Sequence, residues 1–261
     1  MVGEEEWARR ILEKELKRNV ALNDDGSMPG MYDLRVGPAD APEVAVECVA
    51  AVDPIFTETW NLGPAKGPLE LALEGDWSIT LTPSARVNAI KQRVEPLLRE
   101  LEDQGLHNVS VNHALKQNDS ALFQELSSLE VTRADCFRLP GTGKVHLLMS
   151  GIGGAVDSQG AAVPRWVGEF LRDSDRQDVL RKLQRSGATD RQAFVFVSFG
   201  GAPWSVQYYL MTELDQIPAE APDLPPPVTG VWVVSQFGQR GLRWDGGAWR
   251  LFEARGEGID A

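Results

Sequence analysis

The sequence predicts an α/β protein with a mixed central sheet and helices on both of its faces. Apolar runs of strand length alternate along the chain with amphipathic segments of helix length. The 261 residues, of which 43% are hydrophobic, are enough to bury a sizeable core. The composition first breaks at the glycine-rich run GIGGAVDSQGAA, so we expect an α/β core over residues 1–150 and a C-terminal α/β extension over residues 151–261.

The N-terminal segment predicts a helix followed by a pair of strands. Residues 4–18 carry a single apolar stripe, formed by Trp7, Ala8, Ile11, Leu12 and Leu16. The turn residues of NDDGSMPG then end the helix. The runs MYDLRV and EVAVECVAAV are typical of strands, and the short segment GPADAP between them indicates a hairpin-like connection.

A further strand, DWSITLTP, precedes a long predicted helix over residues 84–105. Ser84 can cap this helix, Gly105 closes it, and Pro96 inside it predicts a kink. The next segments predict a strand, a helix and two strands, in the order HNVSVN, SALFQELSS, LEVTRADCFRL and KVHLLMSG.

The last hundred or so residues repeat the α/β pattern. One or two helices are predicted in VPRWVGEFLRDSDRQDVLRKLQRSG, and RQAFVFVSFG is a strongly β-prone strand. A polyproline-like connector, IPAEAPDLPPPVTG, leads to the strand VWVVSQF. The final run, LRWDGGAWRLF, predicts a hairpin that turns at residues 245–247.

The formal net charge of −12 restricts the function. Proteins that grip nucleic acid through phosphate contacts usually present a basic surface, because affinity comes from counterion release. The acidic total therefore counts against a general nucleic-acid binder, although it leaves room for a small basic cleft.

The cysteines, histidines and hydropathy indicate a cytoplasmic protein without a zinc site. Cys48 and Cys136 lie in strand-like surroundings, which suits two buried thiols in a reducing compartment. The three histidines are scattered and lack the spacing of zinc ligands. We expect no membrane span, because no apolar run approaches the roughly 20 residues required, and no secretion signal.

The two strands of the predicted hairpin each carry one acid in an apolar setting. In a strand, alternate side chains share a face, so Asp33 of MYDLRV and Glu47 of EVAVECVAAV can point to the same side. Two neighbouring carboxylates repel each other and need a compensating cation. Mg²⁺ or Mn²⁺ prefers oxygen ligands, so Asp33 and Glu47 are a candidate metal site. A structural ion pair or an open sheet edge is the alternative.

The order of these acids resembles the PD-(D/E)XK superfamily of restriction-endonuclease-like nucleases. Asp33 in GMYDL falls at the first strand acid of that family, and Glu47 in VAVECV falls at the second motif. The resemblance covers roughly residues 1–112, and the same runs resemble a group of actinobacterial proteins of similar length. It implies a mixed restriction-endonuclease-like sheet and a Mg²⁺-dependent phosphodiesterase acting on DNA or RNA.

The chain departs from this pattern at the motif lysine. The residue two after the second acid is usually Lys, which positions the attacking water, but this chain has Val49 there. Some members of the fold supply the cation from elsewhere, and Lys14, Lys66 or Lys91 is a candidate for that role. The family also uses an acid on the first helix. Glu5 and Glu15 can both face inward on the helical wheel, and we choose Glu5 as the third catalytic candidate.

Two other regions are candidates for contact with a partner. A basic stretch holds the expected nucleic-acid contacts Arg172, Arg176, Arg181, Lys182 and Arg185, although interleaved acids also suit a solvated helix with i,i+4 ion pairs. The tryptophans Trp232, Trp244 and Trp249 can stack on bases, or else act as core or interface anchors. The rival function is therefore a catalytically degenerate nuclease fold that serves as a binding or assembly module, for example in a homodimer formed through the C-terminal hairpin.

Overall fold

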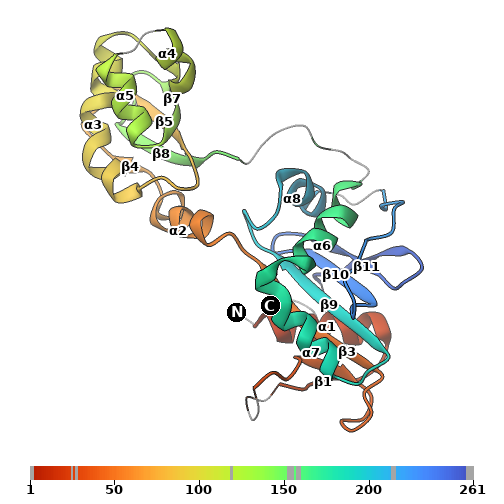
Figure 1. The fold of residues 1–261 in the computed structure, drawn as a ribbon. Coiled ribbons are helices and arrows are strands. Elements are labelled where there is room, and N and C mark those ends of the chain that lie inside the picture. The colour runs from red at the N-terminus through yellow and green to blue at the C-terminus, as the bar shows by residue number, and fades with distance from the viewer. Residues whose placement is uncertain are drawn as a thin grey trace. The chain divides into compact units, whose positions relative to one another are not determined.

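The computed structural model of the protein describes residues 3–24, 26, 29–117, 120–151, 156, 160–212 and 216–256. The chain divides into two compact units (Figure 1): unit 1 joins residues 1–52 to residues 155–261, and unit 2 spans residues 53–154. This division differs from the expected boundary at residue 150, because the first three strands complete their sheet with strands from the C-terminal part of the chain. Residues 152–155 and 157–159 of the glycine-rich run lie outside the described residues.

Unit 1 contains a mixed sheet of seven strands. Their order across the sheet is β1 (Val20–Leu22), β2 (Leu34–Val36), β3 (Val44–Ala51), β9 (Asp190–Val197), β10 (Gly230–Ser235), β11 (Arg240–Trp244) and β12 (Trp249–Glu253). Strands β1 to β3 are antiparallel, β3, β9 and β10 are parallel, and β10 to β12 are antiparallel again. The predicted hairpins β2–β3 and β11–β12 are both confirmed.

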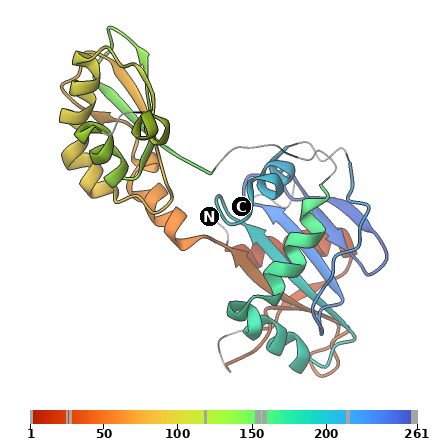
Figure 2. The same cartoon turned by 45° about the horizontal axis from the view of Figure 1, so that its top comes forward.

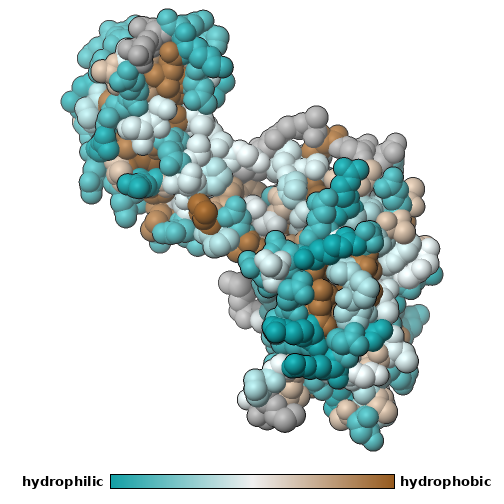
Figure 3. All heavy atoms as spheres, viewed as in Figure 1, coloured by the Kyte–Doolittle hydropathy of each residue, from teal (hydrophilic) through white to brown (hydrophobic). Residues whose placement is uncertain are grey.

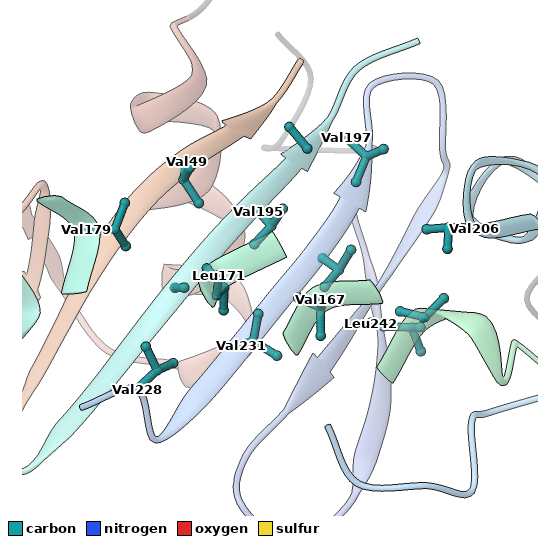
Figure 4. Packing of buried hydrophobic residues seen from close by; sticks show 14 of the residues in the cluster. Val49, Val167, Leu171, Val179, Val195, Val197, Val206, Val228, Val231 and Leu242 are labelled. Carbon is teal, nitrogen blue, oxygen red and sulfur yellow. The ribbon is translucent and has the colours of Figure 1, made fainter. Parts of the chain in front are cut away.

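Helices cover both faces of this sheet. Helices α6 (Ala162–Arg172), α7 (Gln177–Arg185) and α8 (Trp204–Met211) pack on one face, and the short 3₁₀ turn Ser174–Arg176 joins α6 to α7. Figure 4 shows this core, where Val49, Val195 and Val231 of three neighbouring strands lie beneath the helices. Because β3 is central and buried on both faces, it reads as a nearly continuous apolar run.

Helix α1 (Glu4–Leu16) packs on the opposite face. Its Ile11 and Leu12 pack with Val46 of β3, and the Trp7 ring stacks on Phe196 at a centroid distance of 5.3 Å. The indole Nε1 of Trp7 also donates to the carbonyl oxygen of Ala254, 2.9 Å away. The first helix of the chain is thus joined to the C-terminal end of the last strand, which confirms the predicted helix and its apolar stripe.

Unit 2 has its own sheet of five strands. Their order is β4 (Leu69–Glu70), β8 (Lys144–Met149), β5 (Asp76–Leu81), β7 (Val131–Arg138) and β6 (Asn108–Ser110). The helices of this unit are α2 (Pro54–Leu62), α3 (Val87–Asp103), α4 (Val111–Gln117) and α5 (Ala121–Ser128), with a 3₁₀ turn at Pro64–Lys66. Trp77 and Ile79 of β5 pack against Ile90, Val94 and Leu98 of α3 in a separate hydrophobic core.

The two mixed sheets and their helices confirm the α/β class at the level of the whole chain. The expected strand HNVSVN is shorter than predicted, because α4 begins at Val111. Within the described parts of the chain, no helix has both the length and the apolar character that spanning a bilayer requires.

Candidate functional site

The hairpin of unit 1 brings Asp33 and Glu47 opposite each other. Strands β2 and β3 pair with Leu34 opposite Val46, and extending this antiparallel register by one residue places Asp33 across from Glu47. The backbone N–H of Cys48 donates to Asp33 Oδ2 at 2.6 Å, which fixes the Asp33 carboxylate against β3. Both acids are almost fully buried, with 6% of Asp33 and 4% of Glu47 exposed. The predicted juxtaposition is therefore present.

Glu47 faces the helix layer that contains α7. Its neighbours Ala45 and Val49, two residues away on either side, point into the core beneath that layer. From α7, Lys182 reaches down to the carboxylate, and its Nζ lies 2.7 Å from Glu47 Oε1. The second oxygen, Oε2, is also buried and has no hydrogen-bond partner among the described residues. Glu47 thus has one satisfied oxygen and one that lacks a partner.

Burial perturbs the protonation of both acids. Burial first, and then the negative charge of Asp33, raise the pKa of Glu47 to about 8, although Lys182 opposes the shift. Burial likewise raises the pKa of Asp33, against the opposing effects of the Cys48 N–H and of Lys182. Near neutral pH, the site therefore retains a proton that an exposed pair of carboxylates would release.

Lys182 is the cation of this site. Burial alone would lower the pKa of its amine, but the hydrogen bond and charge of Glu47, followed by the charge of Asp33, outweigh burial and raise that pKa. Val179 and Leu183 on the same helix are buried in the core, so the turn of α7 that carries Lys182 is held against the sheet. The helix packing therefore sets the position of the ammonium group.

Glu5 lies on the other side of β3. It is exposed in the first turn of α1, the helix that covers the face opposite α7. A hollow of about 410 Å³ in this region is lined by Gly3, Glu4, Glu5, Glu6, Leu22 and Cys48. The charge of Glu5 contributes to raising the pKa of Asp33, so Glu5 acts on the pair at a distance. Burial first, and then the charges of Asp33, Glu47, Glu5 and Glu4, raise the pKa of the Cys48 thiol well above its ordinary value, which keeps the thiol protonated.

The suggested replacements for the motif lysine do not join the acid pair. Lys14 is exposed on α1, while Lys66 and Lys91 belong to unit 2, where Lys91 donates to the carbonyl oxygen of Leu62. Lys182 comes to the pair instead, although the sequence assigned it to nucleic-acid contact. On this amphipathic helix, Lys182 follows the apolar Val179 by three positions and directly precedes the apolar Leu183. This spacing is the signal that could have placed Lys182 on the inner side of α7.

The side chains of this site supply only part of the coordination shell of a hard divalent cation. Carboxylate oxygens suit Mg²⁺ and Mn²⁺, and the buried Glu47 Oε2, which lacks a hydrogen-bond partner among the described residues, is available to a metal ion. Across the described ranges, however, no group of three or more His, Cys, Asp or Glu side chains is arranged to hold a metal ion. Mg²⁺ is often bound by two protein carboxylates, while water or a substrate phosphate takes the remaining positions.

Helices α6 and α7 lie on a largely hydrophilic side of unit 1 (Figures 1 and 3). Most of the other predicted nucleic-acid contacts, which belong to this segment, already have interactions. Arg172 pairs with Asp223 at 2.5 Å, and Arg181 pairs with Asp178 on its own helix at 3.2 Å. The guanidinium of Arg176 lies over the Phe170 ring, 4.8 Å from its centroid. Arg185 extends towards Gly30, in the loop that leads to Asp33.

The C-terminal tryptophans are mostly anchors of the core. Trp232 is fully buried, and its Nε1 donates to Gln192 Oε1 at 2.6 Å. Trp249 is also buried and donates to the carbonyl oxygen of Glu220, while Trp244 packs against it with a centroid distance of 5.7 Å. Base stacking on Trp232 or Trp249 would require opening of the core, so the alternative of a core anchor holds for these two residues.

Comparisons of the chain with models of protein families, with curated proteins and with solved structures give no match.

Proposed function

We propose that unit 1 is the core of a metal-dependent phosphodiesterase of restriction-endonuclease-like type, which hydrolyses DNA or RNA. The observation that carries this proposal is the buried group formed by Asp33, Glu47 and Lys182. Two acids on adjacent antiparallel strands and one nearby lysine are the residue types of the motif that the sequence resembles, with the lysine supplied by α7 in place of Val49.

The three side chains divide the work of such a site. Asp33 and Glu47 would hold Mg²⁺ or Mn²⁺, which when bound activates water and stabilises negative charge on a phosphate oxygen. The Cys48 N–H orients Asp33, so this carboxylate needs little reorganisation before binding. Lys182 keeps a positive charge beside Glu47, where it can offset the charge of an approaching phosphate group. Glu47 must lose its proton before it can chelate.

A second candidate function is that of a binding or assembly module with a degenerate nuclease fold, which would assemble as a homodimer. The observation that favours it is the pairing of Lys182 with Glu47, because this cation already compensates one of the two acids. The exposure of Glu5 and the near-complete burial of the pair also favour a structural role.

Calorimetric titration of Mn²⁺ into the full-length protein, followed by a hydrolysis assay, separates the two functions. We expect saturable Mn²⁺ binding that is lost in Asp33→Asn and in Glu47→Gln. The matched control is Glu43→Gln, because Glu43 precedes the same strand but is exposed and pairs with Arg18 at 2.8 Å. Hydrolysis of single- and double-stranded DNA and RNA should require Mg²⁺ or Mn²⁺ and disappear in both site variants. Absence of Mn²⁺ binding in the wild type would leave the binding module as the function.

A further inference from the structure

One face of the unit 2 sheet is open. Trp77 and Ile79 of β5 point into the core beneath the helices, and Figure 2 shows α3 lying along that side of the sheet. The alternate residues Ser78 and Thr80 point to the opposite face. Among the described residues of unit 2, no helix packs on that face, because all four helices contribute to or border the core on the other side.

An exposed aromatic pair lies on this open face. Phe137 of β7 is 58% exposed, and its ring meets the ring of His146 of β8 edge-on, with centroids 5.6 Å apart. His146 is the cross-strand neighbour of Ser78, so the aromatic pair lies next to the polar side chains of β5 at the centre of the sheet. A large apolar ring left in water on a sheet face is an informative exception, since such rings are usually buried.

Three cations lie on the same face of the sheet as the aromatic pair. Arg138 follows Phe137 on β7, with 65% of its side chain exposed and its guanidinium 3.9 Å from the carboxylate of Asp76, and Lys144 on β8 has no ion pair with a described residue. Arg133 also lies on β7, where it binds Asp135 at 2.6 Å and the amide oxygen of Asn108 at 3.0 Å. The acids of this face are the half-buried Asp135, which is thereby compensated, the buried Asp76, which pairs with Arg138, and the exposed Glu70, which is opposite Lys144. The three cations and the three acids of this face therefore balance, in a chain with a net charge of −12.

We propose that the open face of unit 2 binds single-stranded nucleic acid, with one base stacked on Phe137 and the adjoining phosphates held by Arg138 and Lys144. The hydroxyls of Ser78 and Thr80 offer hydrogen bonds to base edges on the same surface. An exposed ring can stack only on an unpaired base, because the bases of a duplex already stack on each other. The inference rests on the proposed function, since it names single strands as the substrate class of that enzyme.

The composition of the face favours nucleic acid over a protein partner. Its exposed apolar side chains are few, with Phe137 and Leu148 on the strands and Leu139 at the edge. Hydroxyl, imidazole and cationic groups, together with two ion-paired carboxylates, occupy the other outward positions of β5, β7 and β8. The centre of a protein interface is usually depleted of charge, and a sheet that stacks bases combines one or two rings with cations.

Fluorescence anisotropy on the full-length protein tests this surface without catalysis. The probe is a fluorescein-labelled oligothymidylate in EDTA at low salt, compared with the same strand annealed to oligoadenylate. We expect the single strand to bind more tightly, and Phe137→Ala to weaken its binding about tenfold, as expected for loss of one stacked base. The matched control is Phe237→Ala, which removes a ring in unit 1 that is 52% exposed. Lys144→Glu should weaken binding and lower its salt dependence.

The outcomes separate the inference from the proposed enzyme. Binding that is equal in Phe137→Ala and wild type, or no binding of the single strand, overturns the inference even if the protein hydrolyses nucleic acid, and a protein partner then becomes the occupant to seek. Asp33→Asn should retain wild-type binding, because Asp33 lies in unit 1. Thermal unfolding of each variant checks its folding, and an unchanged midpoint is expected because Phe137 and Lys144 are exposed.

Discussion

Lys182 Nζ and Glu47 Oε1 lie 2.7 Å apart, although 135 residues separate the two in the chain. The whole of unit 2 and helix α6 lie between them in sequence. Their contact joins α7 to β3 across one face of the unit 1 sheet, and it places a positive charge beside two buried acids. Because a buried charge without a partner is costly, each member of the group depends on the others.

We predict that Lys182→Met destabilises the protein by about 2 kcal/mol, within the range for a buried polar group that loses its partner. The loss stays below that of breaking a fully ionised buried pair, because Glu47, with a pKa of about 8, can take up a proton. Urea denaturation measures the change. The matched control is Arg181→Met, which removes the neighbouring exposed cation and should change stability by less than about 1 kcal/mol. Equal effects of the two substitutions would mean that the buried pair contributes nothing.

Stability should fall as the pH rises towards about 8. The pKa of Glu47 is raised from 4.5 to about 8, so the folded state binds a proton that the unfolded state releases between these values. The stabilisation from this proton is therefore fully present below the unfolded pKa of Glu47 and is lost as the pH rises through its folded pKa. Asp33 is shifted in the same direction, whereas the stabilisation from the raised pKa of Lys182 is constant over this interval and is lost only above the ordinary pKa of lysine.

Unfolding free energies across this interval test the sign. We expect the wild type to lose stability between about pH 5 and about pH 8, by at most about 1.4 kcal/mol per pH unit for one proton. Glu47→Gln cannot titrate and should show a flatter profile, whereas the exposed control Glu43→Gln should follow the wild type. A profile of Glu47→Gln that parallels the wild type would assign the pH dependence to other groups.

Local pattern was enough to predict the acid pair. Asp33 and Glu47 lie on strands joined by a short connection, so alternation and antiparallel pairing bring their side chains together. The helix α1 and the C-terminal hairpin follow from equally local signals. These predictions succeeded because each depends on residues that are close in sequence.

Non-local pairing explains what the sequence did not reveal. Strand β3 is completed by β9, which pairs with it in parallel from residue 190 onwards, after a second α/β unit has intervened. That inserted unit has the same alternation of strands and helices, so composition gave no sign of its limits. The position of Lys182 depends on the same crossover, because α7 immediately precedes β9. No periodicity within a short window carries this information.

Mn²⁺ binding should release a proton and strengthen as the pH rises from about 6 to about 8. Chelation requires ionised Glu47, and its pKa of about 8 means that the metal competes with a proton over this range. Calorimetry in two buffers with different ionisation enthalpies counts the protons released. An affinity that does not change with pH would place the metal away from Glu47.

Unit 2 should fold on its own when residues 53–154 are expressed as a fragment. Among the described residues, its core contains residues of this unit alone, and its sheet pairs with no strand of unit 1. The half-buried carboxylate of Glu102 offers a specific check. Glu102 on α3 accepts from Trp77 Nε1 at 2.9 Å and from the backbone N–H of Gly75 at 2.8 Å. We expect the fragment to unfold cooperatively in urea, with tryptophan fluorescence as the readout.

Glu102→Ala should lower the stability of this fragment by about 1–3 kcal/mol, because it leaves the indole and amide donors without an acceptor. The control is Glu100→Ala. Glu100 is an exposed residue on the same helix, and its carboxylate accepts a hydrogen bond from the side chain of Gln104, so its loss should have a much smaller effect. A fragment without a cooperative transition would show that unit 2 depends on unit 1 for its fold. Equal destabilisation by the two substitutions would instead assign the effect to helix propensity, because both replace Glu by Ala on α3.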